Sequence, residues 1–342
     1  MAVFFKKINK TKNIQCLACS HYCQIKNNST GICGVRLNTD GKLTPLTYGR
    51  PVSVNIDPIE KKPLFHFLPG SEIFSFGTFG CNFRCAFCQN WDISQFPKLN
   101  KEFTKIIAET KETWPPEKIV EYCLENKLPS IAYTYNEPTV FIEYAYDTMV
   151  LAKKHGLKNV FVSNGYQSKE TIKAIAPYLD AINIDLKSFD DKFYQKICGA
   201  KLEPVLENIK KFHQLKVWVE ITTLIIPQEN DSEKELEAIA DFIAKIDIDI
   251  PWHISRFFPA YQMSNYPPTD LSTLQTAYKI GKNKKLNFVY LGNVNEEGFE
   301  NTYCPNCQTL LIKRSGYEIE IQPDFQNGRC LKCGNKIHGI WK

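Results

Sequence analysis

The sequence predicts an α/β protein built around a partial or full TIM-like barrel of six or seven βα units, with a small cysteine-rich metal-binding module at each end. From residue 72, short apolar runs alternate with helical stretches, which is typical of parallel βα units. Most of the thirteen cysteines fall into three groups. Grouped cysteines that lie outside a disulfide framework indicate metal sites.

The expected division is an N-terminal module over residues 1–70, the barrel over 71–300 and a C-terminal module over 301–342. The first stretch is rich in turn-forming residues and lacks helical periodicity, so metal rather than an apolar core is expected to hold it together. The last stretch has two paired cysteine turns around an apolar run at 310–321, which resembles a zinc ribbon.

The barrel strands are predicted from the apolar runs, and the helices lie between them. Strands are expected at 73–78, 131–135, 159–163, 181–186, 217–226, 253–257 and 288–291. Helices are expected near 117–126, 140–155, 169–176, 202–214, 232–246 and 271–283. Because a βα barrel carries its reactive groups at the carboxyl ends of its strands, polar residues at these ends are the candidate site residues.

Composition argues against some classes of function without excluding a nucleic-acid partner. The net charge of +5 comes from a small excess of basic residues, which are mainly lysines. A nucleic-acid partner usually requires a basic stripe, and the sequence does not show one. No run of about 18 apolar residues occurs, so no membrane span is expected. The N-terminal apolar stretch is too short for a signal peptide, and a cytoplasmic protein is expected.

Three cysteines, Cys81, Cys85 and Cys88, follow the first predicted barrel strand with C-x3-C-x2-C spacing. Three thiolates are one short of full ligation of a [4Fe–4S] cluster, which leaves one iron open for chemistry. The alternative is a zinc ion completed by a distant ligand, although zinc sites usually take their cysteines in pairs. The spacing, with Phe87 before the last cysteine, resembles the loop of the radical S-adenosylmethionine (SAM) superfamily.

That resemblance implies a [4Fe–4S] cluster whose open iron binds SAM, and it gives roles to residues at the next strand ends. Glu137 stands where the superfamily receives the SAM ammonium group, but it can also serve as a plain helix start before Pro138. Ser163 and Asn164 can hydrogen-bond a ribose hydroxyl, or can form an ordinary βα turn with Gly165.

Asp185 and Lys187 lie two residues apart on a strand and therefore share a face. They form either a structural ion pair or a pair that contacts a ligand. Their Asp-x-Lys pattern resembles the glycyl-radical-enzyme activating enzymes, where it contacts SAM and the peptide substrate. His253 and Asn293, at the ends of the last two strands, are candidates for the adenine side of the pocket, with a buried core histidine as the alternative for His253.

The outer cysteines form two further candidate metal sites. Cys304, Cys307, Cys330 and Cys333 form two C-x-x-C pairs typical of structural zinc. Cys16, Cys19, Cys23 and Cys33 can hold either zinc or a second iron–sulfur cluster, and His21 can replace one thiolate.

Taken together, the motifs resemble the radical SAM protein of the AmmeMemoRadiSam system, which is related to the pyruvate formate-lyase activating enzymes. This implies an electron donor, and AMMECR1-like and Memo-like partner proteins. Two functions are therefore expected as alternatives. The first is a radical SAM oxidoreductase that abstracts hydrogen from a protein or peptide, with RNA or a small molecule as a variant substrate. The second is a non-catalytic binding module held together by zinc.

Overall fold

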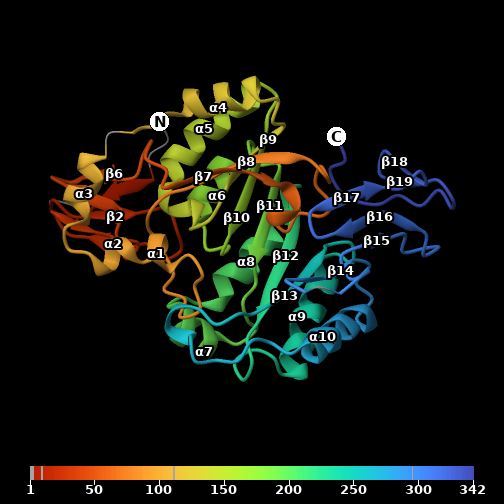
Figure 1. The fold of residues 1–342 in the computed structure, drawn as a ribbon. Coiled ribbons are helices and arrows are strands. Elements are labelled where there is room, and N and C mark those ends of the chain that lie inside the picture. Colours follow the sequence, from red (N-terminus) through yellow and green to blue (C-terminus); the bar gives the residue numbers. More distant parts are fainter. Residues whose placement is uncertain (1–3, 9–10, 111, 295) are drawn as a thin grey trace.

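The computed structural model describes residues 4–8, 11–110, 112–294 and 296–342. Its centre is an eight-stranded sheet with the order β14-β13-β12-β11-β10-β9-β8-β7 (Figure 1). The strands are β7 (Ser53–Pro58), β8 (Glu72–Gly77), β9 (Ser130–Tyr133), β10 (Lys158–Ser163), β11 (Ala181–Asp185), β12 (Trp218–Ile225), β13 (Trp252–Arg256) and β14 (Val289–Gly292). Strands β8 to β14 are parallel, and β7 is antiparallel to β8. In the described structure, β7 and β14 do not pair with each other and are the two edges of this sheet. The sheet is therefore open, and the predicted α/β class is confirmed in its partial-barrel form.

Six helices connect the parallel strands, as the periodicity predicts. They are α4 (Pro116–Glu125), α5 (Ile142–Lys154), α6 (Lys169–Ile175), α8 (Leu202–Gln214), α9 (Glu233–Ile246) and α10 (Leu271–Asn283). Their starts follow from local chemistry: Pro116 occupies the first turn of α4, and Ser168 and Ser232 cap α6 and α9 through their hydroxyl groups. Figure 1 shows these helices arranged around the sheet.

Short helices occupy segments for which the sequence predicts no element. After the three-cysteine loop, the chain forms α1 (Trp91–Ser94), α2 (Phe96–Leu99) and α3 (Phe103–Glu109). Single turns lie at Ile59–Lys61 and Pro138–Phe141. Beyond β11, α7 (Asp191–Phe193) continues into a π-helical turn at Tyr194–Cys198. None of these segments is long enough to show a clear period.

The N-terminal part forms two small antiparallel sheets at one side of the barrel (Figure 1). They contain β1 (Phe5–Lys7), β2 (Ile14–Cys16) and β3 (Gln24–Ile25), and β4 (Ser29–Thr30), β5 (Arg36–Thr39) and β6 (Lys42–Pro45). Arg36 donates to both carboxylate oxygens of Glu143 on α5, at 2.6 and 2.7 Å, and so ties these sheets to the barrel. Strand β7 lies in the stretch expected to belong to this module, but it pairs with β8 in the central sheet.

The C-terminal part forms a hairpin ribbon on the other side of the barrel (Figure 1). It contains β15 (Thr302–Tyr303), β16 (Leu310–Ser315), β17 (Glu318–Ile321), β18 (Phe325–Gln326) and β19 (Arg329–Cys330). Its apolar core includes Phe65 and Tyr290 from the barrel. Across the described residues, no helix has the length and apolar character needed to cross a membrane.

Candidate active site

The three-cysteine loop begins where β8 ends and is held by backbone contacts with the π-helical turn. The amides of Arg84 and Ala86 donate to the carbonyls of Cys198 and Ile197, at 2.8 and 3.0 Å. Cys85 is buried, and Cys81 and Cys88 are half-buried. Burial raises the pKa of the Cys81 and Cys88 thiols, so these sulfurs lie in a low-dielectric site where bound cationic iron would favour their thiolate form.

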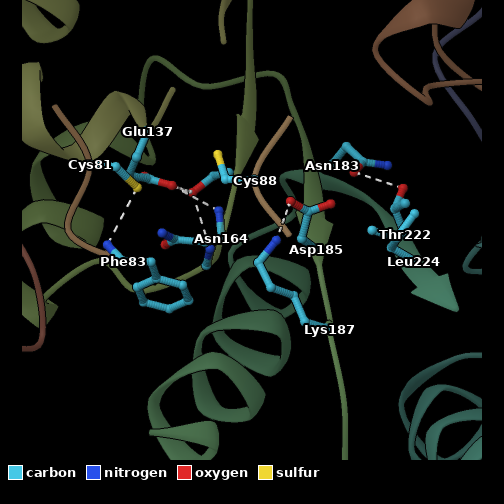
Figure 2. A network of polar contacts seen from close by, with 12 residues as sticks. Cys81, Phe83, Cys88, Glu137, Asn164, Asn183, Asp185, Lys187, Thr222 and Leu224 are labelled. Carbon is cyan, nitrogen blue, oxygen red and sulfur yellow. Dashed lines mark hydrogen bonds and ion pairs between the residues drawn. The ribbon is translucent and has the colours of Figure 1, made fainter. Parts of the chain in front are cut away.

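The loop opens onto a cavity of about 530 Å³ at the carboxyl ends of the strands. Side chains from every strand of the parallel sheet, or from the loop that follows it, line this cavity. Those named as candidates from sequence are Cys81, Cys85, Cys88, Glu137, Ser163, Asn164, Asp185, Lys187 and Asn293. The volume is typical of a small-molecule site, and Figure 2 shows several of these side chains converging.

Glu137 is buried and fully engaged with protein donors (Figure 2). Its carboxylate accepts from the backbone amides of Thr139 at 3.0 Å and Asn164 at 2.8 Å, and from the Ser163 hydroxyl at 2.9 Å. Burial raises its pKa despite these bonds. Glu137 therefore caps the turn at Pro138–Phe141, as the helix-start interpretation predicts, and it also lines the cavity. Contact with the SAM ammonium group stays a prediction.

Asn164 connects that carboxylate to the cysteine loop. Its backbone amide donates to Glu137, and its side-chain amide donates to Asn82 Oδ1 at 2.7 Å. Asn82 lies between Cys81 and Phe83, so the end of β10 is hydrogen-bonded directly to the three-cysteine loop. Asn293, with φ of 60°, donates to Ser255 Oγ at 2.9 Å on the opposite wall.

Asp185 and Lys187 form an ion pair of 2.8 Å, and both line the cavity (Figure 2). The Lys187 ammonium also lies 5.5 Å from the centre of the Phe87 ring, beside the cysteine loop. Burial opposes its charge, but Asp185 and the neighbouring thiols outweigh that effect and raise the pKa of Lys187. The site thus keeps a fixed positive charge near the three sulfurs.

The structure does not bring His253 to the cavity. The ring lies deeper in the barrel, where Nε2 lies 2.7 Å from a carboxylate oxygen of buried Glu220. That carboxylate also accepts from the backbone amides of Phe65 and His66, at 3.0 and 2.8 Å. These two residues belong to the buried segment 64–67, which we call the plug segment. His253 and Ser255 share a face of β13, but only Ser255, one layer higher, lines the cavity.

Two lysines that were not predicted as site residues also face the cavity. Lys61 and Lys62 line the cavity, and both contact Asp57 on β7, at 2.9 and 2.6 Å. The Tyr135 hydroxyl donates to the same carboxylate at 2.5 Å. The Lys-Lys pair shortly before the first parallel strand was a visible signal, but its use required knowing that β7 joins the sheet.

The C-terminal cysteines have the geometry of a single-ion site. Cys304 and Cys333 sulfurs lie 3.5 Å apart, those of Cys307 and Cys330 lie 3.6 Å apart, and all four lie within 4.8 Å of one another. Four thiolates around one zinc ion have sulfurs about 3.8 Å apart, because the Zn–S distance is about 2.3 Å in a tetrahedron. The ribbon residues therefore fit a metal ion.

Several known proteins are similar to this chain. Residues 76–243 match the family model described as Radical SAM superfamily. The chain is 44% identical over 338 residues to an uncharacterized protein of Methanocaldococcus jannaschii, with 98% of each chain covered. It is 28% identical over 221 residues to a putative glycyl-radical enzyme activating enzyme of the same organism, covering 64% of this chain and 77% of that one.

More distant relatives extend this picture. The pyruvate formate-lyase-activating enzyme of Clostridium pasteurianum is 23% identical over 171 residues, covering 49% of this chain and 67% of that one. Among solved structures, Streptococcus suis SuiB bound to its precursor peptide SuiA aligns with a TM-score of 0.51 at 16% identity, covering 69% of this chain and 51% of that one. The structural likeness shows a shared fold.

Proposed function

Because the chain belongs to the radical SAM superfamily and is a radical SAM enzyme, we propose that it abstracts hydrogen from a protein or peptide, as a glycyl-radical-enzyme activase does. The observation that carries the proposal is the Asp185–Lys187 pair in the cavity beside the cysteine loop, in a chain related to activating enzymes. Such a pair can hold a peptide backbone and a cofactor carboxylate at once, because it offers both an acceptor and a charged donor.

The residues fit the cofactors of the superfamily. Cys81, Cys85 and Cys88 would hold a [4Fe–4S] cluster, and the cavity beside them is large enough for SAM. When bound, these groups supply the electron and the 5′-deoxyadenosyl radical that takes the hydrogen atom. The chain's own contribution is to position the cofactors and to exclude water from the barrel mouth.

The polar residues divide that task. Glu137 fixes the positions of Ser163 and Asn164, which would hydrogen-bond the ribose. Lys187 would attract a carboxylate, and Asn293 would line the opposite wall. Lys61 and Lys62 add positive charge on the side of β7, which favours a substrate that carries carboxylates.

The test is an anaerobic assay of the iron-reconstituted protein with dithionite, SAM and a synthetic peptide that contains deuterated glycine. We expect 5′-deoxyadenosine that carries deuterium, and none from the Cys85→Ala variant. Unlabelled 5′-deoxyadenosine from wild type with every peptide tried would instead favour RNA or a small molecule as substrate. Protein that contains only zinc and never yields 5′-deoxyadenosine would support the non-catalytic binding module and overturn the enzyme assignment.

The resemblance to the AmmeMemoRadiSam protein also supports a proposal about partners. We propose that AMMECR1-like and Memo-like proteins bind this chain or receive its product. Co-purification of tagged wild-type protein with each partner tests binding. Mass spectrometry of each partner after incubation with SAM and reductant tests modification, and an unbound and unmodified partner would rule that partner out.

A further inference from the structure

The four N-terminal cysteines enclose a site whose geometry differs from that of the zinc-like ribbon. Cys16, Cys19 and Cys33 are buried, and Cys23 is half-buried. Four thiols of one small module are thus largely shielded from solvent. Such an enclosed, sulfur-rich site suits a soft metal group.

The spacing of these sulfurs indicates the kind of metal group. Among the described residues, the ribbon cysteines are the only group of three or more ligand atoms within 4.8 Å of one another. The sulfurs of Cys16, Cys19, Cys23 and Cys33 do not form such a compact group, and neither do those of Cys81, Cys85 and Cys88. Wider spacing is expected when each thiolate binds a different iron of a cluster, whereas single-ion zinc draws its ligands together.

The N-terminal site also directly adjoins the SAM-cluster loop. Nε2 of His21 lies 3.0 Å from the carbonyl oxygen of Asn82, the residue after Cys81. Gly80, with φ of +91°, packs so tightly that a Cβ atom there would lie 2.8 Å from the Cys33 carbonyl oxygen. The backbone at Cys33 therefore packs directly against Gly80, the residue before Cys81.

Lys98 provides a charge that both sites share. Its ammonium donates to the Phe83 carbonyl oxygen at 2.6 Å, inside the SAM-cluster loop. Burial lowers the pKa of Lys98, and the thiolates of Cys81 and Cys33 both oppose that shift. One half-buried cation therefore interacts electrostatically with a cysteine of each group.

We propose that Cys16, Cys19, Cys23 and Cys33 bind a second [4Fe–4S] cluster that passes electrons to the SAM cluster. A low-potential carrier protein of the flavin or iron–sulfur class reduces the N-terminal cluster from its 2+ to its 1+ state. That electron then reduces the cluster at Cys81, Cys85 and Cys88 from 2+ to 1+, and the N-terminal cluster returns to 2+. No bond forms or breaks in this transfer, and the route does not depend on the substrate.

Arg36 lies where it would influence the reduction potential of such a cluster. Its Nε donates to Cys16 Sγ at 3.1 Å, and its other nitrogens are held by buried Glu143. Hydrogen bonds to ligand sulfurs help set the potential of an iron–sulfur cluster. Arg36 is thus a positioning residue that raises the potential of the N-terminal cluster, so that a carrier protein can reduce it.

The decisive measurement is metal content and electron paramagnetic resonance of full-length, anaerobically prepared protein. Wild type should hold about eight irons, and the Cys81→Ala/Cys85→Ala/Cys88→Ala variant about four, with a reduced signal that SAM does not alter. The Cys16→Ala/Cys19→Ala variant should keep about four irons and a signal that SAM does alter. Cys123→Ala, which removes a buried cysteine outside all three groups, is the control and should match wild type. A triple variant that holds zinc but no iron would overturn the proposal.

Three further measurements test the relay and the role of Arg36. Fully reduced wild type should show spin coupling that is absent from the sum of the two variants. Arg36→Lys should lower the potential of the SAM-insensitive signal alone. The ratio of 5′-deoxyadenosine formation with a flavodoxin system to that with dithionite should fall at least about tenfold in the Cys16→Ala/Cys19→Ala variant. An unchanged ratio would overturn the relay while leaving the proposed hydrogen abstraction intact.

Discussion

The carboxylate of Asp57 is held by three donors beside the cavity. Lys62, Lys61 and the Tyr135 hydroxyl approach its oxygens at 2.6, 2.9 and 2.5 Å. Burial would raise the pKa of Asp57, but these donors outweigh it and lower the pKa well below the ordinary range. The group therefore stabilises the folded protein above the unfolded-state pKa of about 3.9, and this contribution is lost as pH falls through the folded-state pKa.

We expect Asp57→Asn to lower the free energy of unfolding by about 3 kcal/mol near pH 7, because it leaves the buried Lys62 ammonium without a counter-charge. The difference from wild type should shrink as pH falls below about 4, where Asp57 of the unfolded wild-type chain begins to protonate while the folded protein still holds the carboxylate charged. Urea denaturation at several pH values measures this. Asp40→Asn, which removes a fully exposed partner of Lys12, should have no comparable effect, and a pH-independent loss in Asp57→Asn would contradict the linkage.

A second prediction concerns the pair in the cavity. Asp185→Asn should slow 5′-deoxyadenosine formation at least about tenfold, because it removes the partner that keeps Lys187 charged and oriented. The matched control is Asp241→Asn, which breaks a surface ion pair of 3.0 Å with Lys284. Neither of these two residues lines the cavity. Equal rates in the two variants would mean that the Asp185–Lys187 pair is only structural.

At the residue scale, the sequence predicts side chains that follow a parallel strand better than side chains that reach the site by tertiary packing. Glu137, Asn164 and Lys187 line the cavity as their strand-end positions suggest. His253 is also on a barrel strand, but its layer is occupied by Glu220 and Phe65. Only the long-range contacts of the plug segment decide which layer is accessible, and no local pattern encodes these contacts.

At the scale of elements, the approach of the N-terminal sheets to the cysteine loop depends on Gly80. Its φ of +91° is in the left-handed range, and a Cβ atom would lie 2.7 Å from Val35 Cγ1. An added methyl group would therefore incur both backbone strain and crowding. Gly156 has a similar φ of +78° but nothing within 4 Å of the same position.

This contrast gives an element-scale prediction. Gly156→Ala should cost about 1 kcal/mol of stability, which is the strain alone. Gly80→Ala should cost about 2 to 4 kcal/mol, because crowding against Val35 and Cys33, just before β5, is added. Chemical denaturation of both metal-free variants measures the difference. Equal losses would show that the loop and the N-terminal sheets are not tightly packed in solution.

The strands and helices of the barrel were largely predictable, and β7 shows why one was not. The seven parallel strands are almost wholly buried and appear as apolar runs. Strand β7 is an edge strand that begins two residues after Pro51 and ends at Pro58, with Asn55 and Ile56 exposed. The sequence of β7 therefore resembles the turn-rich stretch before it. Only its pairing with β8, a tertiary contact, makes it a strand of the central sheet.

At the scale of the whole molecule, the C-terminal ribbon is part of the barrel's structure. Phe65 and Tyr290 belong to the ribbon's apolar core. Arg314 on β16 is buried and donates to the Phe65 carbonyl oxygen at 2.8 Å. The same plug segment donates its amides to Glu220 inside the barrel. The ribbon and the barrel interior around Glu220 are therefore linked by one hydrogen-bond network through the plug segment.

This shared network predicts that metal loss from the ribbon weakens the entire protein. Cys330→Ser should remove about one zinc ion per chain and lower the melting temperature of the barrel by several degrees, because the ribbon core no longer supports Phe65 and Arg314. Zinc analysis and calorimetry measure the two effects, and iron content should stay unchanged because Cys81, Cys85 and Cys88 lie at the opposite, carboxyl end of the strands. A barrel transition at the wild-type temperature, in protein that has lost its zinc, would show that the ribbon is an independent appendage.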